Sequence, residues 1–253
     1  MPRFAVISDI HANLHALCTV MEDALQRQGC TEVVCLGDVV GYNAYPRECL
    51  DYIRSLGCPV VKGNHDADVS GGDLTRMNPV ARRAIEWTRE QLGEEERVWL
   101  ARLPYQRLER SLFTLVHSCL DQPMAWNYIM NANDATASFR RQFSSLCFHG
   151  HTHVPRVFIY DGMRASEDAE AMDILRQEGE VSLSLADGYK YFINVGSVGQ
   201  PRDGDSRACY VIFDSDARVV TFRRLVYDVA SAQQAILAAD LPEALAERLG
   251  RGC

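Results

Sequence analysis

Lysine is nearly absent from this sequence of 253 residues, and no segment of it is strongly basic. Of the 26 basic residues only Lys62 and Lys190 are lysines, and the formal net charge is −8. Stable binding to a nucleic acid needs a basic stripe that displaces counterions from the phosphate backbone. We therefore expect no stable nucleic-acid partner.

Long apolar runs are also missing. No segment approaches the roughly 20 apolar residues of a membrane-spanning helix. The apolar stretch near the start of the chain, at residues 4–7, is too short for the core of a signal peptide. We expect no membrane partner and a cytoplasmic location.

The nine cysteines include no Cys-x-x-Cys pair, and their number is odd. Reduced thiols in a cytosolic protein are the simplest interpretation. The composition, with 47% hydrophobic and 24% charged residues, is that of an ordinary globular protein. A chain of this length buries about three quarters of its unfolded surface, so we expect a single domain over residues 1–253.

Strands and helices alternate in the first part of the chain, which indicates a partly parallel sheet. Asn13 can cap a helix that ends before Gly29, and Pro46 can open another that stops at Gly57. The expected order is a strand at 3–8, a helix at 13–28, a strand at 33–36, a helix at 46–56, a strand at 59–62 and helices at 80–92 and 94–102.

The second half is richer in predicted strands. The acidic interval 163–180 is expected to be a solvated helical excursion. Two packed sheets flanked by helices fit this order, and the fold class is α/β. The expected strands are 105–108, 111–116, 146–149, 155–160, 181–185, 189–195, 208–214 and 218–225, and the expected helices are 134–143, 228–239 and 242–249.

Asp, Asn and His gather directly after predicted strands. Strand ends in a layered α/β protein converge on one rim, and neighbouring glycines let the backbone approach a metal or a phosphate. Mixed oxygen and imidazole ligands suit zinc, manganese or iron better than calcium. A metal site is therefore predicted from five motifs: Ser8-Asp9-Ile10-His11, Gly37-Asp38, Gly63-Asn64-His65-Asp66, His117 and Gly150-His151-Thr152-His153.

Each motif also has a purely structural interpretation. Asp9 and Asp38 could form turns, and Gly63-Asn64-His65-Asp66 is good turn chemistry. Their combination favours function, because five of the seven histidines fall in these motifs. The other two histidines, His15 and His149, and the nearby Tyr42 keep open roles, since each could simply pack against the core.

In order and spacing these motifs resemble the calcineurin-like metallophosphoesterases. The segment from Asn194 to Arg202, with the sequence NVGSVGQPR, further resembles a bacterial branch of predicted phosphatases and phosphodiesterases often grouped with diadenosine tetraphosphatases. The resemblance spans residues 4 to about 225. It implies a four-layer α/β/β/α sandwich of two mixed sheets flanked by helices.

The resemblance also implies two divalent metal ions. Mn²⁺ is the expected metal, with Zn²⁺, Fe, Ni²⁺ or Mg²⁺ as alternatives, since the metal bound in cells follows availability as well as ligand type. Spacing alone does not assign a ligand to either ion. By resemblance, Asp9, His11 and His153 hold the first ion, Asn64, His117 and His151 hold the second, and Asp38 bridges the two.

Two such ions polarise phosphoryl oxygens and hold a hydroxide that attacks phosphorus in line, so no covalent intermediate is needed. His65 follows the ligand Asn64 and is not itself a ligand in the family. It is expected to protonate the leaving oxygen or to stabilise its charge. Asp66 either orients this loop or simply forms a turn.

The expected substrate is a small phosphorylated molecule, nucleotide-like, cleaved by a phosphodiesterase or phosphatase. The segment after Asp38 lacks the arginine that protein Ser/Thr phosphatases and diadenosine tetraphosphatases carry there, which disfavours their substrates. Asn194 and Arg202 are the candidates for contact with substrate, although Arg202 fits a surface loop equally well. The alternatives are a phosphomonoesterase of broad specificity, a non-catalytic metal-binding scaffold and a structural-metal protein.

Overall fold

The two predicted sheets are present in the computed structural model, which describes residues 2–75 and 77–253. Within these residues both sheets are mixed, because β1 pairs with β2, β4 with β5, and β5 with β9 in parallel, whereas the other pairs are antiparallel. The first sheet has the order β2-β1-β10-β11-β8, with β1 Arg3–Ile7, β2 Glu32–Cys35, β8 Glu180–Ser184, β10 Ala208–Asp214 and β11 Val219–Leu225. The second has the order β3-β4-β5-β9-β6-β7, with β3 Gln106–Glu109, β4 Phe113–Val116, β5 Leu146–His149, β6 Arg156–Tyr160, β7 Ala165–Glu167 and β9 Lys190–Asn194.

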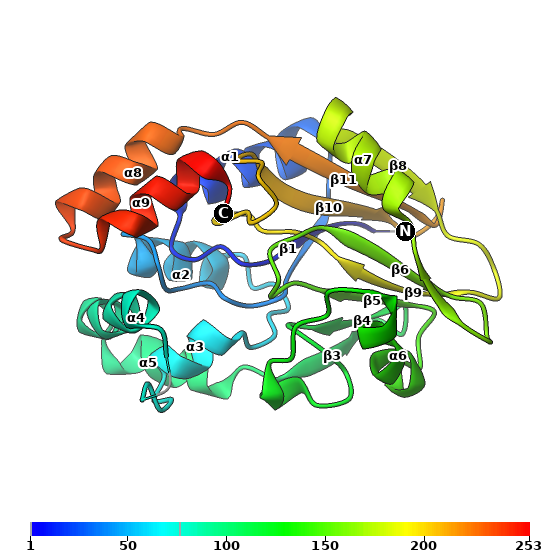
Figure 1. The fold of residues 1–253 in the computed structure, drawn as a ribbon, viewed down its shortest axis with the longest axis horizontal. Helices are drawn as coiled ribbons and strands as arrows, with labels where there is room; N and C mark the ends of the chain where they lie inside the picture. The colour runs from blue at the N-terminus through cyan, green and yellow to red at the C-terminus, as the bar shows by residue number, and fades with distance from the viewer. Residues whose placement is uncertain (1, 76) are drawn as a thin grey trace.

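The sheets pack face to face over an apolar core (Figure 1). Successive strand residues point to opposite faces, so Phe4 of β1 enters the core between the sheets while Ala5 packs on the helix side. Phe113 of β4 meets Phe4 edge to face, with ring centroids 5.0 Å apart, and Phe213 of β10 at 5.5 Å. These aromatic contacts join the two sheets.

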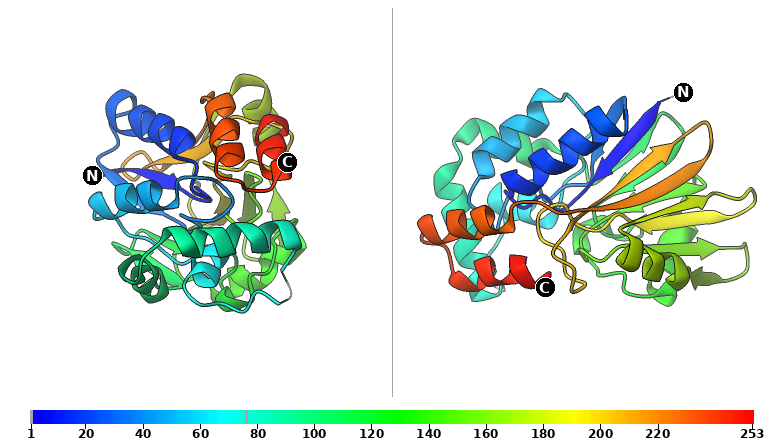
Figure 2. Two further views of the ribbon diagram at one scale, coloured as in Figure 1. Left: turned by 90° about the vertical axis from the view of Figure 1, so that its left-hand side faces the viewer. Right: turned by 90° about the horizontal axis from the view of Figure 1, so that it is seen from above.

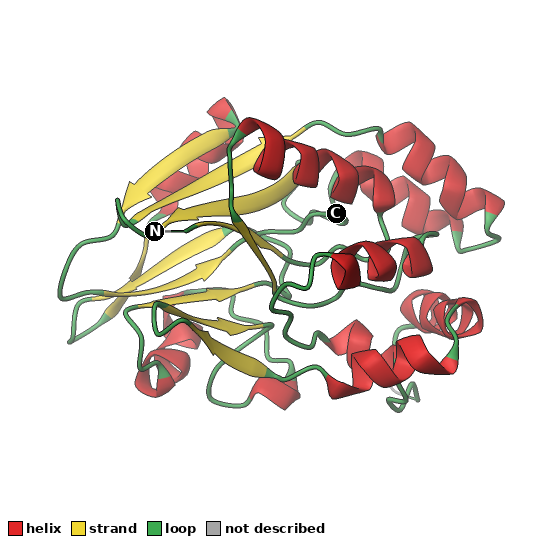
Figure 3. Cartoon of the chain, turned by 180° about the vertical axis from the view of Figure 1, so that it is seen from behind, coloured by secondary structure: helices red, strands yellow, loops and turns green. Residues whose placement is uncertain are grey.

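Helices cover the outer faces of both sheets and gather beyond one end of the strands (Figures 2 and 3). Helix α1 packs on β10 of the first sheet, and α6 packs on β6 and β9 of the second. The predicted four-layer α/β/β/α architecture is therefore confirmed. The helices are α1 Leu14–Glu22, α2 Pro46–Ser55, α3 Asn64–Val69, α4 Pro79–Gln91, α5 Glu94–Arg102, α6 Ala132–Arg141, α7 Ala169–Glu178, α8 Val229–Ala238 and α9 Glu243–Arg251.

Local capping explains where several of these helices begin. The side chain of Asn13 accepts a hydrogen bond from the backbone N–H of Ala16 at 3.1 Å, as predicted for an N-cap. Helix α1 then widens into a π-helical turn, Asp23–Arg27, before Gly29. No helix among the described residues combines the length and the apolar character needed to cross a membrane.

Three predicted segments differ from the structure. Residues 59–62 form only an isolated parallel bridge, Cys35 with Val60, because the backbone N–H of Lys62 turns to the carbonyl of Pro104 at 2.7 Å. Residues 64–69 form α3, where no helix was predicted and a turn was the structural alternative. The interval 163–180 is more than a solvated helix, since β7 pairs with β6 and Leu175 of α7 is buried between the sheets.

Candidate metal centre

The predicted motifs meet at one rim, where β1, β2, β4 and β5 end. Backbone hydrogen bonds join the loops there: the N–H of Asp9 donates to Gly37 at 3.0 Å, that of His11 to Asp38 at 2.9 Å, and that of Gly150 to His117 at 2.9 Å. Parallel strands bring their carboxyl ends to the same edge of a sheet, which is why residues distant in sequence converge.

The backbone of this rim is strained. A positive φ is uncommon for any residue with a side chain, and such strain persists mainly at functional sites. Gly150 and Gly63 add close approaches, since a Cβ at Gly150 would lie 2.4 Å from Asp9 Oδ2 and one at Gly63 would lie 2.0 Å from Asp38 Oδ1. Five predicted ligands have positive φ: Asp9 at 54°, His11 at 48°, Asp38 at 52°, His151 at 70° and His153 at 61°.

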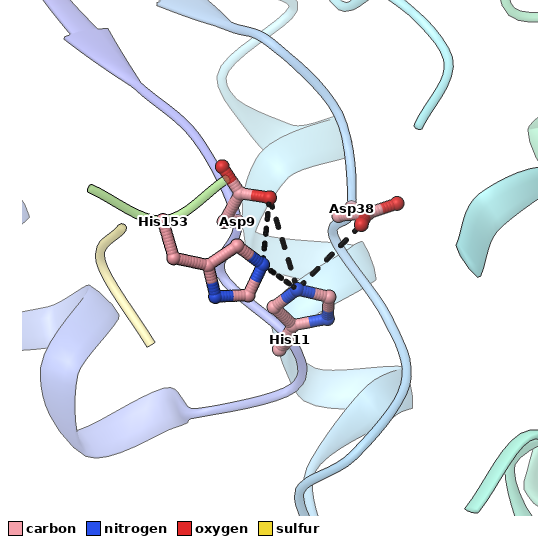
Figure 4. Close-up of side chains that lie close together, drawn as sticks. All are labelled: Asp9, His11, Asp38 and His153. Carbon is pink, nitrogen blue, oxygen red and sulfur yellow. Dashed lines mark hydrogen bonds and ion pairs between the residues drawn. The ribbon is translucent and has the colours of Figure 1, made fainter. Parts of the chain in front are cut away.

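The first cluster consists of Asp9, His11, Asp38 and His153 (Figure 4). The Nε2 atoms of His11 and His153 lie 3.1 Å apart. Asp9 Oδ1 lies 3.2 Å from His153 Nε2 and 3.8 Å from His11 Nε2, and Asp38 Oδ2 lies 3.5 Å from His11 Nε2. All four side chains are buried.

The second cluster shares Asp38 with the first and adds His117 and His151. His117 Nε2 lies 3.3 Å from Asp38 Oδ2 and 3.2 Å from Asn64 Oδ1. The same carboxylate oxygen of Asp38 thus faces histidines of both clusters. Asp38 therefore belongs to both clusters.

Backbone carbonyls set the tautomers of the histidines. The Nδ1 atoms of His11, His117 and His153 meet the carbonyl oxygens of Val40, Leu36 and Gln200 at 3.2, 2.8 and 2.5 Å. A carbonyl only accepts, so each Nδ1 carries the proton and each Nε2 presents a lone pair to the cluster. His151 is reversed: its Nε2 donates to the carbonyl of Trp126 at 2.8 Å, which leaves Nδ1 as its ligand atom.

These residues fit divalent cations. Two lone-pair nitrogens 3.1 Å apart repel one another unless a cation lies against both. Asp9 Oδ1 is buried and has no hydrogen-bond partner among residues 2–75 and 77–253, whereas buried polar atoms normally have one. Mixed carboxylate and imidazole donors suit first-row transition metals.

The charges of the site also favour a bound cation. Burial alone would raise the pKa of the Asp38 carboxyl, but the charge of His117 outweighs it and holds the pKa well below its usual range. Burial alone would lower the pKa of His117, yet the Asp38 carboxylate raises it to about 9, so in the absence of a cation a proton occupies the Nε2 lone pair. The two buried carboxylates therefore require positive charge beside them.

Asp66 lies behind the metal ligands and orients their loop. Its carboxylate accepts hydrogen bonds from the backbone N–H groups of Gly63, Asp38 and Val39 at 3.0, 2.8 and 3.0 Å. Burial and the nearby Asp38 charge raise its pKa to about 7. Of the two interpretations of Asp66, the contacts favour the one that orients the loop.

His65 lies beside the first cluster rather than in it. Its ring is 4.8 Å from that of His11 and 4.3 Å from that of Tyr42, and its backbone N–H donates to Asp38 Oδ1 at 2.8 Å. Burial lowers its pKa to about 4, so the imidazole is neutral at pH 7. A neutral ring next to the ligands can donate a hydrogen bond to a bound phosphoester.

Asn194 and Arg202 have different surroundings. Asn194 is fully buried, and its Nδ2 donates to the Gly150 carbonyl at 2.6 Å and to Thr152 Oγ1 at 2.9 Å, so it holds the loop that carries His151 and His153. Arg202 lies at the cluster, where its backbone N–H donates to the His153 carbonyl at 3.3 Å. Arg202 remains the stronger candidate for contact with substrate.

His149 and His15 lie outside both clusters. His149 stacks on Phe192, with ring centroids 4.1 Å apart, and is fully buried. The ring of His15 meets that of Tyr45 at 5.6 Å. Sequence reasoning did not identify Trp126, Tyr128 or Arg248, because no motif marks them and their loops reach the rim only in the folded chain.

Comparison with known proteins gives consistent results. The sequence profile described as the calcineurin-like phosphoesterase superfamily domain matches residues 3–218. An uncharacterized protein of Methanocaldococcus jannaschii is 37% identical over 254 residues, which covers 98% of this chain and 97% of that protein.

Solved structures show the same fold. A metallophosphoesterase from Sphaerobacter thermophilus matches with a TM-score of 0.85 and 40% identity, over 100% of this chain and 99% of that one. A hypothetical protein from Pyrococcus horikoshii matches with a TM-score of 0.79 over 100% and 99% of the two chains, at 20% identity.

Proposed function

The chain belongs to the calcineurin-like phosphoesterase superfamily, and from this premise we propose that it is a hydrolase that cleaves a small phosphoester with two divalent cations bound at the rim. The observation that carries the proposal is the shared carboxylate of Asp38, whose Oδ2 faces His11 at 3.5 Å and His117 at 3.3 Å. The proposed ligands are Asp9, His11 and His153 for one cation and Asn64, His117 and His151 for the other, with Asp38 common to both.

Bound cations supply Lewis-acid polarisation of the phosphoryl oxygens and an activated water at neutral pH. The side chains of the protein position this chemistry. Asp66 fixes the loops that carry Asp38 and Asn64, and Asn194 fixes the loop that carries His151 and His153. Because His65 is neutral, its imidazole N–H donates a hydrogen bond to the leaving oxygen and stabilises the developing charge.

We propose Mn²⁺ as the physiological metal. Four imidazoles, two carboxylates and one amide form the ligand set, which suits manganese, iron, zinc or nickel better than a site built from oxygen atoms alone would. Magnesium is disfavoured by the number of imidazole ligands. A test of several metals in one assay decides between them.

An exposed aromatic ring beside the second cluster supports a nucleotide-like substrate. Tyr128 stacks on His151, with ring centroids 4.4 Å apart and an interplanar angle of 24°. It is 52% exposed, so its other face is open to solvent. Such a face can stack on a nucleobase, a contact of about 1–3 kcal/mol.

The first test is hydrolysis of bis-p-nitrophenyl phosphate and p-nitrophenyl phosphate by metal-stripped protein resupplied with Mn²⁺, Zn²⁺, Ni²⁺ or Mg²⁺. We expect one of these metals to restore turnover, Asp38→Asn to abolish it, and His65→Ala to lower kcat by about 10²-fold or more. The matched controls are Asp51→Asn on the surface of α2 and His15→Ala on α1, which should keep full activity.

The outcomes separate the alternatives. Preferential turnover of the diester supports a phosphodiesterase, and preferential turnover of the monoester supports a phosphomonoesterase. Two bound ions without turnover of either compound would contradict the proposal and favour a scaffold. For the nucleobase, Tyr128→Ala should raise KM for a nucleotide ester but not for p-nitrophenyl phosphate, and Tyr128→Phe should change neither.

A further inference from the structure

Two arginines from distant parts of the chain meet at one tyrosine next to the metal centre. Arg202 follows β9, and Arg248 lies on α9. The guanidinium carbons lie 5.8 and 5.7 Å from the ring centroid of Tyr42, which is within the range of a cation–π contact. The three residues line a cavity of about 300 Å³ together with Asn78 and Val80 at the start of α4.

In the described part of the chain, neither guanidinium pairs with an aspartate or glutamate side chain. No Asp or Glu in the described part of the chain lies within 4.0 Å of the side-chain nitrogens of Arg202 or Arg248. Arg248 Nε donates to the carbonyl of Cys253 at 2.6 Å, and Arg202 Nη2 donates to Gln200 Oε1 at 3.0 Å and to the Tyr42 hydroxyl at 3.4 Å. The side-chain acceptors of Arg202 are uncharged, whereas Arg248 meets the last residue of the sequence.

Two other sheltered arginines have carboxylate partners. Arg224, whose side chain is 1% exposed, has Asp203 and Asp205 beside it. Arg223 binds Asp23 at 2.7 Å. Burial, followed by the charge of Arg202, lowers the pKa of Arg248, because the two like charges lie close together. Arg202 Nε is also buried and lacks a hydrogen-bond partner among the described residues.

This pair is continuous with the catalytic rim. The Tyr42 ring lies 4.3 Å from that of His65 and 4.7 Å from that of His11. The backbone N–H of Arg202 donates a hydrogen bond to the carbonyl of the proposed ligand His153. Tyr42 and Arg202 therefore connect the metal centre to the two guanidinium groups.

We propose that Arg202 and Arg248, together with the Tyr42 hydroxyl, bind a second anionic group of the substrate, a phosphate or a carboxylate. The enzyme then selects phosphoesters that carry such a group over those with one anionic centre. This inference rests on the proposed function and specifies its substrate class. Guanidinium forks suit both anions, because two parallel N–H groups match two oxygens.

A structural role for the stack is the competing interpretation. Arg248 alone on Tyr42 would suffice to tie α9 to the loop after β2, whereas Arg202, whose side-chain acceptors are uncharged, adds repulsion that a bound anion relieves. The two interpretations differ in a measurable way. A structural tie affects unfolding alone, and an anion site affects the affinity for a second charged group.

The test is calorimetric titration of the Mn²⁺-loaded protein with propylphosphonate, with alkanediphosphonates of three to six carbons, and with phosphonocarboxylates of the same lengths. We expect one length to bind at least about tenfold more tightly than the monophosphonate, the factor of one charge-assisted hydrogen bond. Comparison of the two series identifies phosphate or carboxylate as the preferred group.

Variants locate the effect. Arg248→Gln should abolish the advantage of the second anion, and Arg248→Lys should restore part of it. Arg251→Gln is the matched control, since Arg251 lies on the same helix, is 70% exposed and pairs with Glu247 at 3.4 Å. It should leave the advantage unchanged.

The proposal is overturned if no dianion binds more tightly than propylphosphonate, or if Arg248→Gln keeps the advantage. Either result with normal turnover of bis-p-nitrophenyl phosphate removes the second-anion site alone. Absence of both turnover and propylphosphonate binding removes the proposed function, and the second-anion site with it.

Discussion

Single hydrogen bonds decide which nitrogen of each histidine faces the clusters. Three histidines donate a hydrogen bond from Nδ1 to a backbone carbonyl, and His151 donates one from Nε2. The nitrogen that remains for a cation is therefore fixed before any cation binds. Such contacts orient the ligand rings and raise their basicity. The preorganisation lies in the backbone of the loops, which explains why five of the ligand positions have positive φ.

His149 shows the opposite use of a histidine. It is stacked on Phe192, and its Nε2 has no hydrogen-bond partner within the described residues. Burial, followed by the charge of His151, lowers its pKa to about 3. The ring is an apolar core group that stays neutral in the folded protein.

The pKa of His149 predicts a pH dependence of stability. An unfolded histidine titrates near 6.5, so between about pH 3 and 6.5 the unfolded chain binds one more proton than the folded chain. The contribution of the neutral His149 ring to the free energy of unfolding is complete above pH 6.5. It is lost as the pH falls, by about 1.4 kcal/mol per pH unit. His149→Phe should remove this slope, because Phe keeps the stacking and cannot be protonated.

Urea unfolding of both proteins in EDTA between pH 4.5 and 7.5 measures this effect. The wild-type free energy of unfolding should fall more steeply on acidification than that of His149→Phe. Two parallel profiles would contradict the assigned protonation state.

At the scale of secondary-structure elements, the π-helical turn after α1 has a structural role. It carries Asp23 to the first sheet, where its carboxylate accepts from the Tyr210 hydroxyl at 2.6 Å and from Arg223 Nε at 2.7 Å. Asp23 is 2% exposed. The turn therefore fixes α1 to β10 and β11 through a buried, charged contact.

Removing this carboxylate should destabilise the fold. Asp23→Ala removes the buried partner of Arg223, which keeps its second partner Glu180, so we expect a loss of about 3 kcal/mol, the lower end of the range for a broken buried ion pair. Chemical denaturation measures the loss. The control is Glu22→Ala, which breaks the neighbouring pair with Arg27 at side-chain exposures of 52% and 65% and should cost less than about 1 kcal/mol. Equal losses in both variants would show that Asp23 contributes no buried ion pair.

The elements that the sequence predicted are those with strong local signals. The strands of both sheets follow the apolar pattern, and Asn13 and Pro46 mark helix starts as expected. Residues 59–62 are apolar enough for a strand, but the contact of Lys62 with Pro104 overrides the pattern. The sequence did not predict the start of α3, because Asn and Asp favour turns as well as helix caps.

The metal site was more predictable than its surroundings. Asp, Asn and His after strands carry the ligands, and their order along the chain is enough to expect them at one rim. Tyr128 and Arg248 carry no such signal, since a tyrosine in a loop and an arginine on a helix are ordinary surface residues. Only the packing of their loop and helix brings them to the site.

At the scale of the whole molecule, the cluster joins the two sheets. Asp9 and Asp38 follow strands of the first sheet, and His117, His151 and His153 follow strands of the second. A cation held by both groups links the layers at the end of the sandwich. Without one, buried carboxylates and lone pairs face each other there, which opposes the packing of the sheets.

Metal removal should therefore lower the thermal stability of the entire fold. A cation at about 1,000 times its Kd stabilises the folded state by about 4 kcal/mol, which corresponds to roughly 10 °C in Tm for a chain of this size. Scanning calorimetry with Mn²⁺ and with EDTA measures the difference. Asp38→Asn should lose this shift, because both clusters need its carboxylate, whereas the surface variant Asp51→Asn should keep it. The same scan is repeated with Zn²⁺, Ni²⁺ and Mg²⁺. A wild-type Tm that none of these four metals raises would refute the link between the sheets, since a cation bound only by the folded chain must raise the Tm.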